Sequence, residues 1–543
     1  MGRDVLGSNE GTDRLTQFFD CTAGKYDVLY SKGGSYDMNK FTKQEKSWVL
    51  YDWANSVYAT IIMAAVFPIY FSAVAAAEGF SGDVFWGYAT SASTLLVALF
   101  APILGTLADF KGYKKKLFSF FLILGLAFTL VMAITDNPML MLVGYAVSYI
   151  GFSGGNLFYD SFLTDVSTKD KMDRVSAMGY AMGYLGGSTI PFLVSITLIL
   201  FADTIGIGNT GAVKISVVLT VVWWGLFSIP MLRNVKQVYH IEKPKQKVFA
   251  ETIRNLVKTA KNIVKDKTLL FFILAYFFYI DGVGTVIHMA TSYGSTLGLS
   301  ATGMILALLL TQLIAVPCSI LFSRFSQKIG TLRMLLAGIS VYIVVCLVGF
   351  YMGFSLEPHQ AAYENDYKIV VELATEANPL SEEAENALYK TGFSVLPQKD
   401  RADAFSEDVK TLLTDFPEES EALENASAQI SLFLSANDKS EKYDSALSFS
   451  FILFWILSVL VGTSQGGLQA LSRSFFGKLI PAEQSNEFFG FFDIFGKFAT
   501  IIGPFLYAAF AHATGRSSIG ILSLTALFLL GGIILLVHRK RFS

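Results

Sequence analysis

A loop motif between two apolar segments decides the fold class. Residues 105–116 read Gly105-Thr106-Leu107-Ala108-Asp109-Phe110-Lys111-Gly112-Tyr113-Lys114-Lys115-Lys116. Gly105 allows a second helix to approach closely, and Gly112 allows a tight turn. Asp109 can cap the N-terminus of a neighbouring helix or pair with a cationic side chain. The lysines from Lys111 onward, Lys114 among them, predict that this loop stays on the cytoplasmic side of a membrane.

The chain on both sides of this loop is apolar over long stretches. Of its 543 residues, 53% are hydrophobic and 16% are charged, whereas soluble proteins carry about 25% charged residues. A membrane-spanning helix needs about 20 apolar residues, and buried strands of soluble proteins are only about 4–8 residues long. We therefore predict an all-α membrane protein with twelve transmembrane helices. The predicted spans are 47–72, 84–107, 117–135, 138–164, 175–200, 213–232, 269–290, 302–323, 332–354, 446–470, 487–510 and 517–538.

The distribution of charge predicts the orientation. Ten Lys and Arg residues lie in 233–268, a loop on the same side as the motif. Apart from residues 355–445, the loops on the opposite side hold only Lys214 and Arg516. Positive charge marks the cytoplasmic side, so we expect both termini in the cytoplasm. Residues 355–445 hold 20 Asp and Glu against 7 Lys and Arg, and this acidic segment falls on the outer side.

The predicted spans and charges divide the chain into five regions. The segment 355–445 is expected to be a small helical subdomain or, alternatively, a solvated loop, and a site for an extracytoplasmic partner. The N-terminal extension has no apolar signal-peptide core and is expected to be disordered or to come from a misassigned start. The regions are 1–37, an extension; 38–232, a first six-helix bundle; 233–268, a basic linker with an amphipathic helix; 269–354 with 446–543, a second bundle; and 355–445, an acidic insertion.

The two predicted bundles show traces of an internal repeat. Asp160-Ser161-Phe162 aligns with Ser472-Arg473-Ser474 at an offset of 312 residues, and Gly112 aligns with Gly330 at an offset of 218. The difference between these offsets, 94, is close to the 91 residues of 355–445. Such duplication is common in membrane transporters. It predicts two pseudo-symmetric six-helix bundles, the second of which carries the insertion.

The loop motif resembles the one between spans two and three of the major facilitator superfamily. Residues 48–56 and 465–490 are similar to the vacuole effluxer-like branch, which contains amino-acid effluxers of autophagy and bacterial relatives. The resemblance implies the major facilitator fold, a cavity lined by spans one, four, seven and ten, and efflux of amino acids. It also implies that Gly105, Asp109 and the lysines latch an inner gate. The second copy of the motif, 323–330, carries Gln327 in place of Asp109, so a second latch is in doubt.

Ionisable side chains inside the predicted spans mark the candidate site, because charge in a membrane is costly and usually functional. Asp281 has His288 two helical turns away on the same face, which suggests a proton relay or, alternatively, a buried structural acid. Asp493 and Lys497 are spaced to pair with each other along one helix. Arg473 is the best cationic partner for Asp160. The candidate substrate and coupling residues are Tyr51, Asp52, Asn55, Asn156, Asp160, Asp281, His288, Gln465, Arg473, Asp493 and Lys497.

No motif of an enzyme, a nucleotide-binding loop or a metal site occurs in the sequence, and its five histidines are scattered. We therefore expect no catalysis, no cofactor, no metal and no nucleic-acid partner. The predicted function is secondary active transport of a small solute, an amino acid or a related metabolite, by alternating access across a bacterial cell membrane with proton coupling. Two alternatives stay open: a sensor or scaffold whose acidic insertion is the ligand-binding head, and a lipid flippase on the same fold.

Overall fold

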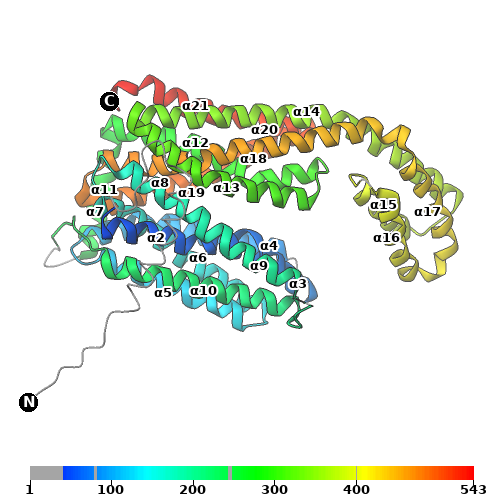
Figure 1. Cartoon of the computed structure of the whole chain (residues 1–543), viewed down its shortest axis with the longest axis horizontal. Helices are drawn as coiled ribbons and strands as arrows, with labels where there is room; N and C mark the ends of the chain where they lie inside the picture. Colours follow the sequence, from blue (N-terminus) through cyan, green and yellow to red (C-terminus); the bar gives the residue numbers. More distant parts are fainter. Residues whose placement is uncertain (1–40, 79–81, 203, 243–247, 399, 543) are drawn as a thin grey trace, which may run out of the picture.

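The computed structural model describes residues 41–78, 82–202, 204–242, 248–398 and 400–542. The predicted extension, 1–37, lies outside these residues. In the described part the chain is helical, and its single β interaction is a parallel bridge between Phe110 and Ile241. Figure 1 shows two helical layers, one built from the first half of the chain and one from the second, with the insertion at one end.

Eleven helices among the described residues are long and apolar enough to cross a membrane. The remaining predicted span, 138–164, is helix α6, Pro138–Ser161. Its glycines, serines and Asn156 make it less apolar than the other spans, and it is largely buried against them. The prediction of an all-α membrane protein is confirmed, whereas the count of spans is confirmed for eleven of the twelve.

The N-terminal half begins with a well-capped helix. Thr42 accepts a hydrogen bond from the amide of Glu45, and the Glu45 carboxylate accepts one from the amide of Thr42, which is the reciprocal capping box that starts many helices. The helices of this half are α2 (Lys43–Val57), which continues through η3 (Tyr58–Ala65) into α3 (Phe67–Ala77), then α4 (Gly82–Asp109), α5 (Lys114–Ile134), α6, α7 (Leu163–Val166), α8 (Met172–Met182), which continues through η4 (Gly183–Thr189) into α9 (Ile190–Leu200), and α10 (Gly208–Asn234).

The C-terminal half follows the linker helix α11, Val248–Lys265. Asp266 caps the next helix by accepting from the amides of Thr268 and Leu269. The two short loops that join α4 to α5 and α13 to α14 both turn at a glycine with positive φ, Gly112 at 79° and Gly330 at 95°. The helices of this half are α12 (Lys267–Thr296), α13 (Ala301–Ile329), α14 (Thr331–Ala377), α18 (Asn437–Leu479), η6 (Ala482–Gln484), α19 (Ser485–Thr514), α20 (Ser517–Ser523), α21 (Thr525–Val537) and η7 (Arg539–Arg541).

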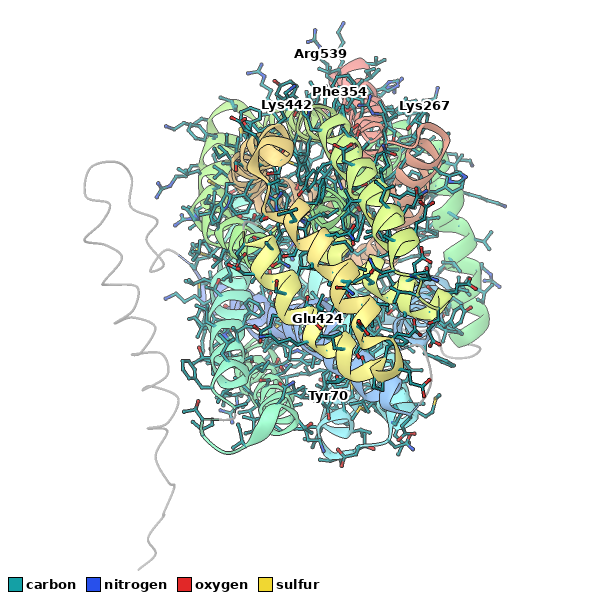
Figure 2. All side chains as sticks on the ribbon, turned by 90° about the vertical axis from the view of Figure 1, so that its right-hand side faces the viewer. Tyr70, Lys267, Phe354, Glu424, Lys442 and Arg539 are labelled. Carbon is teal, nitrogen blue, oxygen red and sulfur yellow. The ribbon has the colours of Figure 1, made fainter. Side chains whose placement is uncertain are left out.

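The insertion is built as an extension of two membrane helices. Helices α14 and α18 run without a break from the membrane part into the insertion. Between them in the chain come α15 (Glu382–Val395), α16 (Arg401–Asp415), η5 (Pro417–Glu419) and α17 (Ser420–Ser435), of which α15 and α17 pack on α14. Arg401 forms an ion pair with Asp444 and donates to the Tyr363 hydroxyl. The insertion has its own buried core of Tyr363, Tyr367, Val371, Leu388, Phe405, Leu423, Ile430 and Phe433. Seen end-on in Figure 2, its helices lie across the end of the bundle between Lys442 and Tyr70.

Candidate functional site

A buried guanidinium joins the two halves of the molecule. Arg473 on α18 donates from Nη1 to Asp160 Oδ1 at 2.8 Å and from Nη2 to Asp52 Oδ2 at 3.3 Å. Its Nε donates to the Ser176 hydroxyl at 2.9 Å, and Nη2 also donates to the Ser176 carbonyl. One side chain of the C-terminal half therefore contacts α2, α6 and α8 of the N-terminal half. The predicted pairing of Arg473 with Asp160 is confirmed, and Asp52 shares the same cation.

Aromatic rings surround the Arg473 guanidinium. Its carbon lies 4.7 Å from the ring centre of Trp48, 5.4 Å from Tyr159 and 4.6 Å from Tyr180. The Tyr159 hydroxyl donates to Asp52 Oδ2 at 2.7 Å, and the Trp48 indole donates to the Tyr159 carbonyl at 2.8 Å. Cation–π contacts of this kind stabilise a desolvated cation, and they fix the orientation of Arg473.

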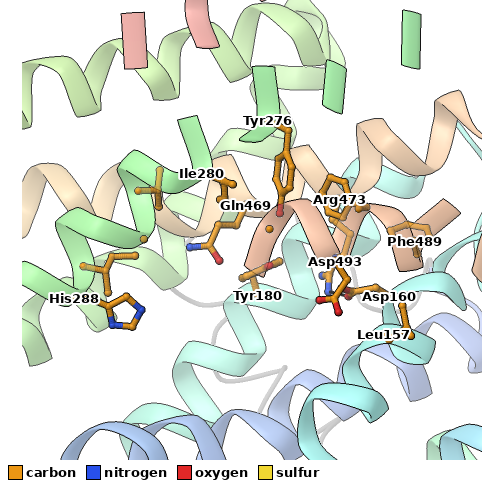
Figure 3. Close-up of a pocket in the computed structure, with 15 residues that line it drawn as sticks. Leu157, Asp160, Tyr180, Tyr276, Ile280, His288, Gln469, Arg473, Phe489 and Asp493 are labelled. Atoms are coloured by element: carbon orange, nitrogen blue, oxygen red, sulfur yellow. Dashed lines mark hydrogen bonds and ion pairs between the residues drawn. The ribbon is translucent and has the colours of Figure 1, made fainter. Parts of the chain in front are cut away.

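A cavity of about 340 Å³ lies beside this cluster, between the two halves. Figure 3 shows Asp160 and Arg473 at one side of it, with Asp493 beside them and His288 farther along α12. The Asp160 side chain is 32% exposed whereas that of Arg473 is 4% exposed, so the carboxylate is the more open partner. Polar residues of the lining are Asp160, Tyr180, Tyr276, His288, Gln469, Arg473 and Asp493, and apolar ones are Leu157, Ile280, Val283, Ile287, Phe489 and Phe492.

The charges of this cluster do not balance. Asp52 and Asp160 share one guanidinium, so with both carboxylates ionised the three groups carry one net negative charge. A guanidinium has five N–H donors, and four of those on Arg473 are used in the bonds described above. The cluster can therefore accept an additional positive group, either a proton or an ammonium, and can donate one more hydrogen bond.

Other predicted polar residues lie away from the cavity lining. The side-chain Nδ2 of Asn55 donates to the side-chain Oδ1 of Asn156 at 2.5 Å inside the N-terminal half. Tyr51 is buried against Tyr159 and Phe118, and Gln465 is buried on α18. None of these four side chains is among the residues that line the cavity.

Asp281 and His288 have different surroundings. Both carboxylate oxygens of the buried Asp281 accept from the amide of Gly503 on α19, at 3.0 and 2.9 Å. Gly503 precedes Pro504, whose ring prevents regular helical bonding at this point. His288 lines the cavity and Asp281 does not. The predicted relay between them thus has no direct contact in the described residues, and the side chain of Lys497 lies outside the described part of the structure.

The loop motif forms a first latch between the halves, made by Asp109, Asn486 and Glu487. Asp109 Oδ1 accepts from the amide and the side-chain nitrogen of Asn486 at 3.0 and 2.7 Å, and Oδ2 accepts from the amide of Glu487 at 3.0 Å. The carboxylate on α4 thus caps the N-terminus of α19, one of its two predicted contacts, where the helix dipole favours negative charge. A Cβ at Gly105 would lie 2.4 Å from the Asn486 carbonyl oxygen, so this glycine permits the close approach.

Lys114 strengthens the first latch from the next helix. Its ammonium, fully buried, donates to Asp165 Oδ2 at 2.6 Å and to the Ser485 hydroxyl at 3.1 Å. Lys111 instead forms an exposed ion pair with Glu242 at 3.3 Å. Lys114 therefore contacts the first turn of α19 beside the first latch, whereas Lys111 contacts the linker.

A second latch connects the halves on the pseudo-symmetric side. It is made by Asp173, Ser326, Thr331, Ser474 and Lys478. Asp173, in the first turn of α8, accepts from the Ser326 and Thr331 hydroxyls at 2.9 and 2.7 Å and from Ser474 and Lys478 at 2.6 Å each. Gln327, which replaces the motif aspartate, is exposed. The second copy of the motif thus takes part in a latch, although its carboxylate is Asp173 of the N-terminal half and not a residue of the motif itself.

Sequence reasoning missed several residues of these sites. Asp173 and Ser176 precede or begin an apolar span and carry no motif, and their partners on the other half are between 153 and 305 positions away. Trp48 lies in a stretch that resembles the family, but no sequence pattern marks it, Tyr159 or Tyr180 as a partner of the Arg473 cation. The only available signal was the pairing of Asp160 with Arg473, because aromatic residues next to a buried arginine often contact it.

Comparisons with known proteins agree with this geometry. The sequence model of the family described as "Vacuole effluxer Atg22 like" matches residues 81–366 and 452–541. An "Uncharacterized MFS-type transporter YxiO" of Bacillus subtilis (strain 168) is 39% identical over 505 residues, which cover 92% of this chain and 95% of that protein.

Solved structures show the same fold. The human organic anion transporter MFSD10 superposes with a TM-score of 0.58 at 11% identity and covers 91% of this chain and 99% of its own. The E. coli fucose:proton symporter FucP superposes with a TM-score of 0.51 at 12% identity and covers 93% and 99%. The family match and the extent of the similarity to YxiO lead to one conclusion: this chain belongs to the vacuole effluxer Atg22-like family and is a multi-pass transporter of the major facilitator type.

Proposed function

We propose that this protein exports an amino acid or a related small metabolite from a bacterial cytoplasm by alternating access, with both termini on the cytoplasmic side. The observation that carries the proposal is the cavity of about 340 Å³ between the halves, which carboxylates and a guanidinium line together. Ligand sites of this kind combine an apolar wall with a few placed polar groups. The family description as effluxers supports the direction.

The lining suits a solute that carries both charges. Asp160 and Asp493 can bind an ammonium, and Arg473, with its remaining N–H, can bind a carboxylate. The apolar residues Ile280, Ile287 and Phe492 line the same cavity and suit a hydrocarbon side chain. A solute with only one of these groups would satisfy only part of the site.

The two latches define the conformational state. Both join the halves at the end of the bundle that carries the loop motif, here called the motif end. Breaking both latches would open this end, so rocking of one half against the other is the proposed movement. Since the lysine-rich motif end is proposed to face the cytoplasm, the described state is closed to the cytoplasm.

Proton coupling is proposed through the shared cluster and through Asp281. The solute's ammonium or a proton would neutralise the extra negative charge beside Arg473. Protonation of Asp281 would weaken its two contacts with the Gly503 amide, and would thereby release α19 at its proline. The two proposals differ in location, because Asp160 lines the cavity and Asp281 does not.

The test is counterflow in proteoliposomes with a panel of labelled amino acids, with and without an imposed pH gradient. Saturable exchange of a zwitterionic solute is expected, and Asp160→Asn and Arg473→Lys should abolish it. Asp136→Asn is the matched control, because Asp136 is exposed and pairs with Lys214 far from the cavity. Asp281→Asn should preserve counterflow and remove its response to the gradient. Absence of exchange across the panel, with the protein folded, would refute the amino-acid proposal.

A further inference from the structure

The linker helix α11 lies at the periphery of the motif end. Figure 2 looks along the membrane helices and shows α11, in light green beside Lys267, crossing their direction. Lys265 ends α11 and Lys267 begins α12, with Asp266 as the cap between them. The helix therefore lies at the level where a membrane span begins, and it runs across the spans rather than along them.

The side of α11 that packs on the protein mixes two threonines with apolar residues, among them the half-buried Leu256. Thr252 and Thr259 are buried at 1% and 0% exposure, and Ile263 is buried with them. Successive residues of an α-helix are about 100° apart, so these three lie on one face. That face packs against α4, α12 and α19.

An adjacent face of α11 is apolar and has no cover from the protein. Val257 is 49% exposed and Val264 is 64% exposed, and these valines are two turns apart on one line. Ile253 and Ala260 lie on the same stripe and are half-buried. A helix that packs only on its own protein would bury its valines and expose its threonines, whereas α11 does the reverse.

The next face of α11 is cationic. Arg254, Lys258, Lys261 and Lys265 share a stripe that follows directly on the apolar one, and all four are exposed. An apolar stripe flanked by basic residues is the pattern of helices that lie in the interface of a bilayer. Clusters of Lys and Arg near a membrane attract anionic lipids.

We propose that α11 binds the anionic leaflet at the motif end, with Val257 and Val264 inserted among the lipids and its lysines on their headgroups. The occupant of the exposed stripe is thus a lipid surface rather than a protein. The same helix packs against α4 and α19, the two helices that the first latch joins. Binding to the leaflet therefore holds α11 where it bridges the closed gate, and the lipid composition acts on the gate through this helix.

The first test measures insertion with the full chain and needs no substrate. After replacement of Cys21, Cys318 and Cys346 by alanine, one fluorophore is attached at Val264→Cys or, as the matched control on the polar side, at Asn262→Cys. The protein is reconstituted in vesicles of three parts phosphatidylcholine and one part phosphatidylglycerol. The label at 264 should be quenched by brominated lipid and protected from aqueous iodide, and the label at 262 should show the opposite. Equal behaviour of the two labels would overturn the proposal.

The second test measures the role of charge. The fraction of phosphatidylglycerol is titrated while quenching of the label at 264 is followed. Removal of each basic residue should weaken the apparent affinity of α11 for the anionic lipid about fivefold. The variant is Lys258→Gln with Lys261→Gln and Lys265→Gln. Its control carries glutamine at three exposed lysines of the insertion, Lys368, Lys390 and Lys410. A titration that is unchanged in the first variant, or shifted equally in both, would refute recognition of anionic lipid. Both tests can fail or succeed independently of the transport proposal.

Discussion

The two latches join the same two halves at the same end of the molecule, and in both the carboxylate lies on the N-terminal half, but they differ in how this carboxylate is related to the repeated loop motif. In the first, the carboxylate of Asp109 belongs to the motif helix, and backbone amides of α19 donate to it. In the second, the loop of the repeated motif supplies hydroxyls, and the carboxylate is Asp173 on the span that packs against it. Both copies of the motif therefore take part in a contact between the halves, but the carboxylate belongs to the motif helix in the first latch and to the helix that packs against the motif in the second.

The difference predicts different sensitivities. Two of the three donors in the first latch are backbone amides that any residue would present, and the third is the side chain of Asn486, so this latch depends mainly on how closely α19 approaches α4. The second uses the side chains of Ser326, Thr331, Ser474 and Lys478, so it depends on sequence. Substitutions at three latch residues test this difference, and a fourth site tests an exposed carboxylate of the insertion; the largest expected effect comes first.

Asp173→Ala should have the largest effect. It removes an ion pair and three hydroxyl contacts at once, and it leaves the ammonium of Lys478, which is 22% exposed, without its partner. Breaking a buried pair in this way costs about 3 kcal/mol or more. We expect a lower thermal unfolding midpoint of the purified protein and faster labelling of Gln469→Cys in the cavity from the motif end.

The conservative variant Asp173→Asn should recover part of this loss, because its amide oxygen still accepts from hydroxyls. If alanine and asparagine behaved as the unchanged protein does, the second latch would contribute nothing to closure. A double variant with Lys478→Gln measures the ion pair separately, since its effect should be smaller than the sum of the two single changes.

Gly105→Ala should have the next largest effect. Its new methyl group would lie 2.4 Å from the Asn486 carbonyl oxygen, so α4 and α19 must separate. Forcing a group into such a contact costs about 1–3 kcal/mol. The matched control is Gly87→Ala on the same helix, where nothing lies within 4 Å of the new atom. Equal midpoints and equal labelling of the two variants would show that the close approach is not required.

Asp109→Asn should have a smaller effect. The asparagine keeps one acceptor oxygen, loses the second, and loses the negative charge at the N-terminus of α19. Interaction of a charge with a helix terminus contributes about 1 kcal/mol. The expected result is a modest increase in labelling of the cavity from the motif end. A larger effect than that of Asp173→Ala would reverse the order of the two latches.

Glu419 in the insertion is the exposed counterpart of Asp109 and should show the smallest effect. Its carboxylate accepts from the amide and the hydroxyl of Ser381, both at 2.7 Å, and these bonds lower the pKa of Glu419 below its usual 4.5. Its contribution to stability is therefore complete above pH 4.5 and is lost as the pH falls through the lowered pKa.

The measurement for this site is amide hydrogen exchange in the first turn of α15 as a function of pH. Ser381→Ala should lower the protection of these amides near neutral pH. In the acid range, the protection in this variant should change less with pH than it does in the unchanged protein. Ser406→Ala, an exposed serine on α16, is the control. A Ser381→Ala variant that keeps the unchanged protein's pH dependence would refute the assignment to Glu419.

The sequence predicts those parts of the site in which both partners carry a recognisable pattern. Gly105, Gly112 and Asp109 stand in one motif, so their close approach, turn and cap could all be derived. The pairing of Asp160 with Arg473 followed from aligning the two halves. In both cases, local spacing or an internal repeat restricts which residues can meet.

The remaining features depend on packing between distant segments. Asp173 shows no pattern, because its partners lie on α13, α14 and α18 and the repeat predicts an acid at Gln327 instead. Asp281 was placed correctly within its span, but its bond to a backbone amide next to Pro504 depends on how α19 packs against α12. Helical periodicity assigns faces to a helix and cannot say which neighbour will cover each face.

The continuous helices α14 and α18 transmit a rotation of the C-terminal half to the insertion and enlarge the displacement at its far end. From Ser355 to Ala377, α14 extends about 35 Å beyond the apolar part at 1.5 Å per residue. A rotation of the C-terminal half by about 10° would therefore displace the far end of α14 by about 6 Å. A pair of fluorophores, one on α15 and one at the outer end of the N-terminal half, would report the rocking of single molecules as a change in energy transfer.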